Sequence, residues 1–387
     1  MHVTTPGFNF FLYDRSQPVS EDSPVWNRKL PSGWNYRVED TDFSVSYGDY
    51  FTAVQSFLEE NNHQILREAV SLQSRKNISP DQPLSKNVYL EKHGALYHPS
   101  RIELIFREET IQFVLNVAVS ASGRKIIDQE YAALTRLCKD LHCPYIPAVY
   151  GKGSGRAGQG SYPMFLGQWL EGFHEFHLSE TSPGKREIVV WDMVSGNRYL
   201  SDKQAKQLYR KAAFILTSCY HPITFEHIFP WHHAAGDFVV GLQDNLLDLR
   251  LITVRGYSSL RADNVDINLQ SILETMLVFF LTLSIRMRID RLDGVKELAW
   301  ADDFSVQETL NGFFEALETM PEETTRGIPL AECFEYYLFS MEEKNLLSVA
   351  EEIVDHYHTQ VIERKIIQEN IEAHIACIKQ GLINRHL

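Results

Sequence analysis

The sequence predicts an α+β protein of two lobes, a small antiparallel β lobe followed by a larger helical lobe. Between residues 87 and 119, apolar and polar residues alternate with a period of two, which is typical of half-buried strands. From residue 200 onward, the apolar residues recur with the 3.6-residue period of amphipathic helices. The chain of 387 residues is long enough for two such parts, because single domains usually have about 50–250 residues.

Residues 1–84 are predicted to form an N-terminal extension. They mix aromatic clusters with proline and acidic turns, and an amphipathic helix is expected around Tyr50–Leu72. Phe51, Val54 and Phe57 lie on the apolar face of this helix. The sequence alone assigns no role to the extension.

Residues 85–172 are predicted to form the small lobe, with the order three strands, one helix, two strands. The helix is expected at Asp128–Leu141, where Tyr131, Leu134 and Leu137 share one face. The strands are expected at Val88–Leu90, Ile102–Phe106, Ile111–Val119, Ile146–Tyr150 and Met164–Leu170.

Residues 173–300 are predicted to form the helical large lobe, and residues 301–387 a set of C-terminal helices. A long helix, Asp202–Tyr220, leads into a loop between two short strands at Ile228–Val240. A further strand is expected at Leu249–Val254. The later helices are expected at Leu269–Ile289, Val306–Glu318, Leu330–Phe339 and Leu346–Leu382.

Charge and composition exclude several classes of protein. There are 37 Lys and Arg against 51 Asp and Glu, and the net charge of −14 argues against a nucleic-acid surface. The five cysteines lack metal-ligand spacing and the N-terminus lacks a signal peptide, so we expect reduced thiols in a cytoplasmic protein. The most apolar stretch, Met276–Ile285, is shorter than the roughly 20 residues that span a bilayer. It is therefore expected to be a buried core helix, not a membrane span.

Three segments occur in an order typical of one enzyme superfamily. Met164–Gly172 reads MFLGQWLEG, Ile228–Val240 reads IFPWHHAAGDFVV, and Leu249–Gly256 reads LRLITVRG. They resemble the hinge, the catalytic loop and the metal-binding Asp-Phe-Gly segment of the protein-kinase-like superfamily, particularly its aminoglycoside-phosphotransferase and small-molecule-kinase branch. Together with the element order, this resemblance implies a two-lobed protein-kinase-like fold.

The resemblance places His232 and Asp237 at the catalytic positions of the loop. In the family, an Asp at the first position orients the acceptor hydroxyl, and an Asn at the second holds a metal ion. The leading His of the family loop is Pro230 in this chain. The metal-binding positions are Asp237 and Thr253, and Thr253 stands where the family has a magnesium-chelating Asp.

The resemblance also implies positions for a nucleotide. The glycine turn that would cover the phosphates contains Gly94 beside bulky Tyr97 and His98, so we expect an ordinary hairpin whose side chains fill the phosphate site. Arg124 and Lys125 lie in an ASGRK stretch that is expected to be a solvated turn. The nucleotide-binding equivalents are Gly94, Ser120, Glu130, Gln168, Trp169 and Leu170.

On this resemblance the phosphate lysine, the metal-chelating Asp and the catalytic carboxylate are each lost, because Ser120, Thr253 and His232 stand at their positions. Ser120 stands at the lysine that would neutralise the α- and β-phosphates, and a hydroxyl carries no such charge. Glu130 stands where the partner of that lysine would be, and without the lysine it is expected to be a surface residue or to form a local salt bridge. Thr253 cannot chelate magnesium, and Arg255 is expected to add a repelling positive charge. ATP and magnesium are therefore not favoured as cofactors.

The sequence thus predicts a degenerate kinase-like protein, a ligand-binding or regulatory module without conventional phosphoryl transfer. Its partner would be a small molecule or protein that the sequence does not identify. One alternative is an active transferase of altered chemistry, with His232 as general base and Asp237 as metal ligand. A second alternative is a structural or interaction protein whose kinase-like order is accidental.

Two other patterns point to different chemistry. Gly153–Gly158 fits the GxGxxG pattern of dinucleotide-binding proteins, but no helix follows it, so a flexible hairpin loop is expected. A transition-metal site is disfavoured because adjacent His232 and His233 point to opposite sides of an extended segment, and packing in a wet cleft is expected instead. The metal candidates are His221, Glu226, His227, His232, His233 and Asp237.

Overall fold

The chain is a mixed α+β protein rich in antiparallel sheet, which confirms the predicted fold class at that level. The computed structural model describes residues 7–13, 17–31, 45–74, 79, 82–94, 96–140, 143–182, 184–192, 195–232, 236–243, 246–261, 267–357 and 361–385. The chain folds into two compact units, with Met1–Cys138 and Pro147–Glu171 in unit 1, and Lys139–Ile146 and Gly172–Leu387 in unit 2. Each unit therefore combines segments that are separated in the sequence.

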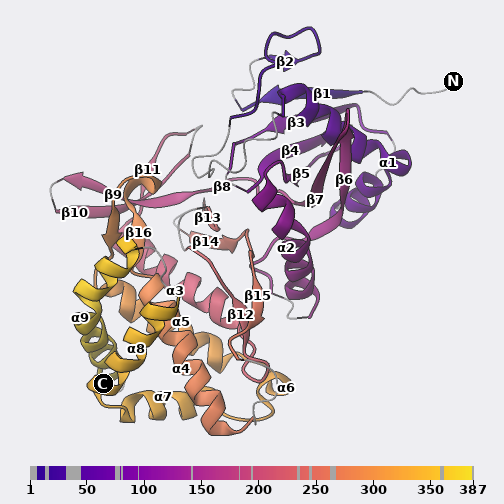
Figure 1. Ribbon diagram of the computed structural model, residues 1–387. Coiled ribbons are helices and arrows are strands. Elements are labelled where there is room, and N and C mark those ends of the chain that lie inside the picture. The colour runs from indigo at the N-terminus through magenta and orange to yellow at the C-terminus, as the bar shows by residue number, and fades with distance from the viewer. Residues whose placement is uncertain are drawn as a thin grey trace. The chain divides into compact units, whose positions relative to one another are not determined.

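Unit 1 is built on a seven-stranded sheet with the order β2-β1-β3-β4-β5-β7-β6 (Figure 1). Paired strands are antiparallel, except that β1 and β3 run parallel. The period-two pattern holds in β5, where Ile111, Phe113, Leu115 and Val117 are buried. The strands are β1 (Phe8–Leu12), β2 (Pro18–Val19), β3 (Ser85–Leu90), β4 (His98–Ile105), β5 (Thr110–Val117), β6 (Val149–Ala157) and β7 (Gly160–Gln168).

Helix α1 (Tyr47–Gln73) packs against β6 and confirms the helix predicted in the N-terminal extension. Ser46 begins it with a capping box, because its hydroxyl accepts from the Asp49 amide while the Asp49 carboxylate accepts from the Ser46 amide. The helix is interrupted at Glu60–His63, where three consecutive residues have positive φ angles. Its buried side chains join the core of unit 1, which also contains the apolar residues of β3, β4 and β5.

The predicted flexible loop at Gly153–Gly158 is wrong, because Gly153 and Gly155 lie inside β6 and pair with β7. The glycines are required by the close approach of α1. A Cβ atom on Gly155 would lie 1.9 Å from the carbonyl oxygen of Ala53 in that helix. The alternation of apolar and polar residues that identifies a strand is absent from this sequence, because glycines stand at the inward-facing positions.

Replacing Gly155 by alanine is expected to lower the free energy of unfolding of unit 1 by about 2–3 kcal/mol, since the helix backbone has to move. Urea unfolding followed by circular dichroism would measure this change. The matched control is Gly7→Ala, because a Cβ atom on Gly7 meets no atom within 4 Å. Equal stability of the Gly155→Ala protein and the wild type would contradict the close packing of α1 on β6.

Helix α2 (Ala121–Asp140) begins two turns earlier than the sequence predicted. Ser120 precedes it and accepts a hydrogen bond from the Gly123 amide at 3.0 Å, which is the geometry of an N-cap. The ASGRK stretch is therefore the first turn of a helix, and its expected role as a solvated turn is wrong. Gly123 is required there, because a Cβ atom would lie 2.1 Å from the carbonyl oxygen of Leu96.

Unit 2 contains two three-stranded sheets, β11-β10-β9 and β14-β13-β8, and two strand pairs, β12-β15 and β16-β17 (Figure 1). The sheet of β9, β10 and β11 was not predicted from the sequence. The strands are β8 (Phe173–His174), β9 (Phe176–Ser182), β10 (Lys185–Val190), β11 (Arg198–Tyr199), β12 (Glu226–Ile228), β13 (Phe238–Gln243), β14 (Leu246–Leu251), β15 (Tyr257–Ser259), β16 (Ile289–Arg291) and β17 (Leu298–Trp300).

The helices of unit 2 pack around an aromatic core in which Phe280 of α4 contacts Phe313 of α5 and Phe334 of α7. The single helix predicted at Leu346–Leu382 is wrong, because the structure has two separate helices, α8 and α9, over this range. The helices are α3 (Asp202–Ser218), α4 (Leu269–Arg286), α5 (Phe304–Glu318), α6 (Glu322–Thr325), α7 (Leu330–Ser340), α8 (Glu343–Tyr357) and α9 (Val361–Arg385), with a 3-10 turn at Leu292–Gly294.

Within the described ranges, α4 is the one helix long and apolar enough by composition to cross a bilayer. However, 78% of it is buried inside the protein. This burial is what a core helix requires, and it agrees with the sequence-based expectation for Met276–Ile285.

Candidate functional site

The loop that resembles a catalytic loop lies between β12 and β13 in unit 2. It begins with a cis peptide bond between Phe229 and Pro230, and it ends in a turn where Gly236 has a φ of 76°. That φ is readily adopted by glycine, and the turn brings the following residue, Asp237, into the interior. Asp237 and Phe238 have no measurable exposure to solvent, so the loop has a fixed, buried end.

Both carboxylate oxygens of Asp237 are occupied by donors from the protein. Oδ2 accepts from the His232 amide at 2.7 Å and from Nη1 of Arg255 at 2.7 Å. Oδ1 accepts from Nη2 of Arg255 at 2.5 Å. The guanidinium therefore grips the carboxylate in the two-point geometry typical of strong Arg–carboxylate pairs.

Arg255, which was expected to add a repelling positive charge near Thr253, forms an ion pair with Asp237. The sequence did not indicate this pairing. Burial raises the pKa of the Asp237 carboxyl above its usual range, and the Arg255 charge opposes that rise. A buried carboxylate needs a positive partner. Here the Arg255 guanidinium takes that place, whereas in a metal site a metal cation would take it.

A second buried arginine holds the start of the loop. Arg286, at the end of α4, donates to the carbonyl oxygen of Trp231 through Nε at 3.0 Å and Nη2 at 2.5 Å. Its guanidinium lies 5.4 Å from the centre of the Phe229 ring and 5.6 Å from that of the Trp231 ring. Burial lowers the pKa of Arg286, and the nearby charges of Glu363 and Asp237 act in the opposite direction.

His232, the predicted general base, is half-buried between these two arginines. Its amide donates to Asp237, and its Nδ1 atom lies 3.4 Å from Nη2 of Arg286. The structure thus brings the His232 backbone and the Asp237 carboxylate together. Their contact is made through the His232 backbone, and the neighbouring guanidinium charges disfavour an additional cation at this point.

Thr253, the second predicted metal position, follows β14 and is half-buried. The adjacent Ile252 amide donates to the carbonyl oxygen of Asp237 at 2.8 Å, so this segment lies beside the end of the loop. The Thr253 side chain supplies no carboxylate. In the kinase family a carboxylate at this position and an Asn in the catalytic loop hold the metal ions. Here the carboxylate is missing, and Asp237, at the position of the Asn, is already bound to Arg255.

The histidine-rich metal alternative gains no support. Within the part of the chain that the structure describes, no group of three His, Cys, Asp or Glu side chains could hold a metal ion. His221 accepts from the Thr224 amide at 3.2 Å, and His227 Nδ1 lies 3.1 Å from the carbonyl oxygen of Ser258. Glu226 accepts from the Thr224 hydroxyl, whereas His233 lies outside the described residues.

In unit 1, two predicted nucleotide positions have structural partners. Ser120 caps α2, and Glu130 accepts a hydrogen bond of 2.6 Å from the Tyr97 hydroxyl. Tyr97 belongs to the turn between β3 and β4, where the Gly94 amide donates to its carbonyl oxygen at 3.1 Å. The Tyr97 hydroxyl of this turn is thus the hydrogen-bond partner of Glu130, where the kinase family would have a lysine. Arg124 lies over the Tyr162 ring, 5.2 Å from its centre.

The hinge-like residues lie at the end of β7, also in unit 1. The Gln168 amide donates to the carbonyl oxygen of Ala148 at 2.8 Å. The Trp169 indole N–H donates to Glu171 at 2.9 Å, and Leu170 is half-buried in the following segment. The strand ends at Gln168, two residues earlier than the sequence predicted, so Trp169 and Leu170 lie in the segment that follows it.

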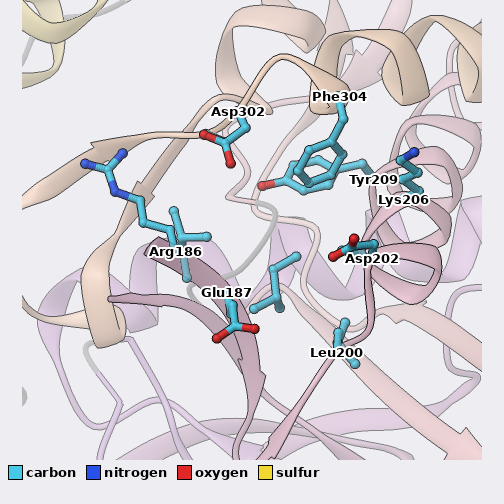
Figure 2. A pocket seen from close by; sticks show the side chains of 12 residues that line it. Arg186, Glu187, Leu200, Asp202, Lys206, Tyr209, Asp302 and Phe304 are labelled. Atoms are coloured by element: carbon cyan, nitrogen blue, oxygen red, sulfur yellow. The ribbon is translucent and has the colours of Figure 1, made fainter. Parts of the chain in front are cut away.

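Sequence reasoning missed a pocket of about 250 Å³ in unit 2. Figure 2 shows Asp302 and the Tyr209 hydroxyl facing its centre, with Asp202 and Glu187 on other sides. Burial raises the pKa of the Tyr209 phenol well above its usual range. The pocket combines an apolar floor with groups of both charges, and none of the predicted site residues lines it. Its lining residues are Leu178, Arg186, Glu187, Ile188, Leu200, Asp202, Ala205, Lys206, Tyr209, Ala301, Asp302 and Phe304.

The pocket was missed because one of its walls is the unpredicted sheet of β9, β10 and β11. The available signal was a pair of β-prone runs, Phe176–Ser182 and Lys185–Val190, separated by a turn that contains Gly184. Gly184 has a φ of 76°, as tight hairpin turns require. The pocket could therefore be anticipated only by recognising this hairpin first.

Comparison with models of known protein families and with curated proteins gives no match to this chain.

Proposed function

We propose that this chain is a degenerate member of the protein-kinase-like superfamily and acts as a ligand-binding or regulatory module without conventional phosphoryl transfer. The observation that decides the chemistry is the ion pair between Asp237 and Arg255, with N–O distances of 2.5 and 2.7 Å. It neutralises the one carboxylate of the loop that could hold a metal ion.

The strand order of unit 1 supports the kinase-like assignment. The strands β3, β4, β5, β7 and β6 are neighbours in one antiparallel sheet, and α2 connects β5 to β6. This is the order of three strands, one helix and two strands expected of a kinase small lobe. In unit 2, the loop joins β12 to β13, and the pairs β12-β15 and β13-β14 bring the Leu249–Gly256 segment beside it.

The charge arrangement supports loss of catalysis. Phosphoryl transfer depends on placing positive charge around the phosphates and on metal ions that bridge them. The Ser120 hydroxyl caps α2, and the Glu130 carboxylate accepts a hydrogen bond from the Tyr97 hydroxyl. A magnesium ion could reach Asp237 only by displacing Arg255, which costs a two-point ionic hydrogen bond in a buried setting.

Calorimetric titration with ATP and magnesium tests this proposal directly. We expect no magnesium-dependent ATP binding and no hydrolysis or transfer of phosphate. Tight magnesium-dependent binding accompanied by turnover would overturn the proposal. The same titration on the Arg255→Met protein is the informative comparison, because that variant exposes the Asp237 carboxylate to any cation without changing the other loop residues.

The alternative of an active transferase requires His232 as base and Asp237 as metal ligand. In the structure both act as parts of one hydrogen-bonded loop, because Asp237 binds the His232 amide and the Arg255 guanidinium. The alternative predicts that His232→Ala abolishes an activity while the protein stays folded. If the protein is not a transferase, His232→Ala should change only ligand binding or the stability of the loop. The backbone amide that binds Asp237 is retained in this variant.

A further inference from the structure

Two buried thiols lie side by side in unit 2, and neither belongs to the proposed site. The thiol of Cys219 donates to Sγ of Cys143 at 3.8 Å. Cys219 follows the last residue of α3 and is completely buried, whereas Cys143 is 7% exposed. All five cysteines of the chain are free thiols.

The surroundings of Cys143 favour its thiolate. Its sulfur accepts the hydrogen bond from Cys219, and the amides of Tyr145 and Ile146 and the charge of Arg250 stabilise a negative charge there. Together these contacts lower the pKa of the Cys143 thiol from its usual value, against the effect of burial. Cys143 is therefore the thiol expected to react first with an oxidant. The buried Cys219 is placed to act as the resolving cysteine, which forms a disulfide with the oxidised Cys143.

Cys143 also lies where the chain passes between the two units. The segment Lys139–Ile146 belongs to unit 2, although the residues before and after it belong to unit 1. Unit 2 holds this segment through several contacts. The Leu251 amide donates to the carbonyl oxygen of Tyr145 at 3.0 Å, Arg250 donates to that of Pro144, and the Tyr145 ring meets Phe214 edge to face.

We propose that Cys143 and Cys219 form a disulfide when the protein meets a peroxide, which fastens this crossing segment covalently to α3. The proposal does not depend on the kinase-like assignment. The sulfur atoms have to approach by about 1.8 Å, from 3.8 Å to the roughly 2.0 Å of a disulfide, a distance that side-chain rotation can supply.

The chemistry balances with hydrogen peroxide as the oxidant. The Cys143 thiolate attacks one peroxide oxygen, the O–O bond breaks, and hydroxide leaves as Cys143 becomes a sulfenic acid. The Cys219 sulfur then attacks the Cys143 sulfur. The S–O bond breaks, the Cys219 proton leaves with the hydroxyl group as water, and the S–S bond forms. In total, two thiols and one peroxide give one disulfide and two waters.

Peptide mapping of the full chain tests this reaction. The reduced protein is treated with hydrogen peroxide, its remaining thiols are blocked, and the denatured chain is digested with trypsin without reductant. Trypsin can cut after Lys139, so Cys138 and Cys143 fall in different peptides. We expect a cross-linked pair of peptides that contains Cys143 and Cys219. We also expect slower cleavage after Lys139 when the oxidised protein is digested in its native state.

Two variants sharpen the result. In Cys219→Ala, the cross-link should be absent and Cys143 should be trapped by dimedone as a sulfenic acid, whereas the matched control Cys333→Ala should cross-link like the wild type. The proposal is overturned if wild-type Cys143 is not oxidised, if it is oxidised without the cross-link, or if the cross-link leaves native cleavage after Lys139 unchanged. The wild-type map decides the question even if a variant fails to fold.

Discussion

Replacing Asp237 by alanine is expected to lower the free energy of unfolding of unit 2 by about 3 kcal/mol. The loss has two sources. The Arg255 guanidinium loses both of its ionic hydrogen bonds, and the His232 amide loses its acceptor. Arg286, which is buried nearby, also loses a favourable charge interaction with the carboxylate. Urea unfolding monitored by circular dichroism and by tryptophan fluorescence would measure the change.

A double-mutant cycle separates the ion pair from the effect of cavity formation. Arg255→Met alone should also destabilise the protein, because it leaves a buried carboxylate without its guanidinium. The double variant Asp237→Ala with Arg255→Met should cost clearly less than the sum of the two single losses, since it leaves no charge unpaired. A control pair is Lys185 and Glu187, whose side chains form a solvent-exposed ion pair that is expected to contribute little to stability. Additive effects at Asp237 and Arg255 would show that the pair contributes little to loop stability.

Acidification is expected to destabilise both units between pH 6.5 and about pH 4. Burial lowers the pKa of His98 and His227 to about 4, and that of His374 to about 3. In the unfolded chain each imidazole binds a proton near pH 6.5. Below that pH the unfolded state therefore holds more protons, so stability is fully present above pH 6.5 and falls as the pH drops.

The expected loss at pH 5 is about 2 kcal/mol for each histidine, from 1.4 kcal/mol per pH unit. Unit 1 contains His98 and also His93, whose pKa burial lowers, and unit 2 contains His227 and His374, so both units should lose stability. Asp237 acts in the opposite direction, because its folded pKa is raised. Urea unfolding at pH 7.5 and pH 5 would measure these losses.

The variant His374→Gln provides the control for this pH dependence. Its amide can keep a hydrogen bond to the Ser284 hydroxyl, which lies 3.1 Å from His374 Nε2, but it cannot bind a proton in this range. We expect the number of protons that unit 2 takes up on unfolding in this pH range to fall by about one. A free energy of unfolding that stays constant between pH 7.5 and pH 5 would contradict the neutral, buried state of these histidines.

The fold could be predicted where local sequence pattern and tertiary environment agree. Strands β3, β4 and β5 were found because their buried faces follow the period of two. The pattern failed where packing overrides it. Gly155 occupies a strand position because the backbone of α1 is so close, and Gly123 lies in the first turn of α2 because the Leu96 carbonyl approaches it.

The candidate site could be predicted in position but not in its contacts. Asp237 was identified from the loop pattern, and its partner Arg255 follows 18 residues later. Whether the Arg255 guanidinium reaches the Asp237 carboxylate depends on the register of β13 and β14 and on the path of the chain after β14. The same limit applies to Tyr97, because its hydrogen bond to Glu130 joins residues 33 positions apart.

Segments of the two units alternate along the chain, and this order determines when each unit has all of its residues during synthesis. Unit 1 needs β6 and β7, which follow the Lys139–Ile146 segment that belongs to unit 2. A nascent chain that ends at Cys138 has the β5 edge unpaired, because β7 is its partner. Unit 1 therefore cannot be transferred to another protein as one uninterrupted piece without bringing part of unit 2 along.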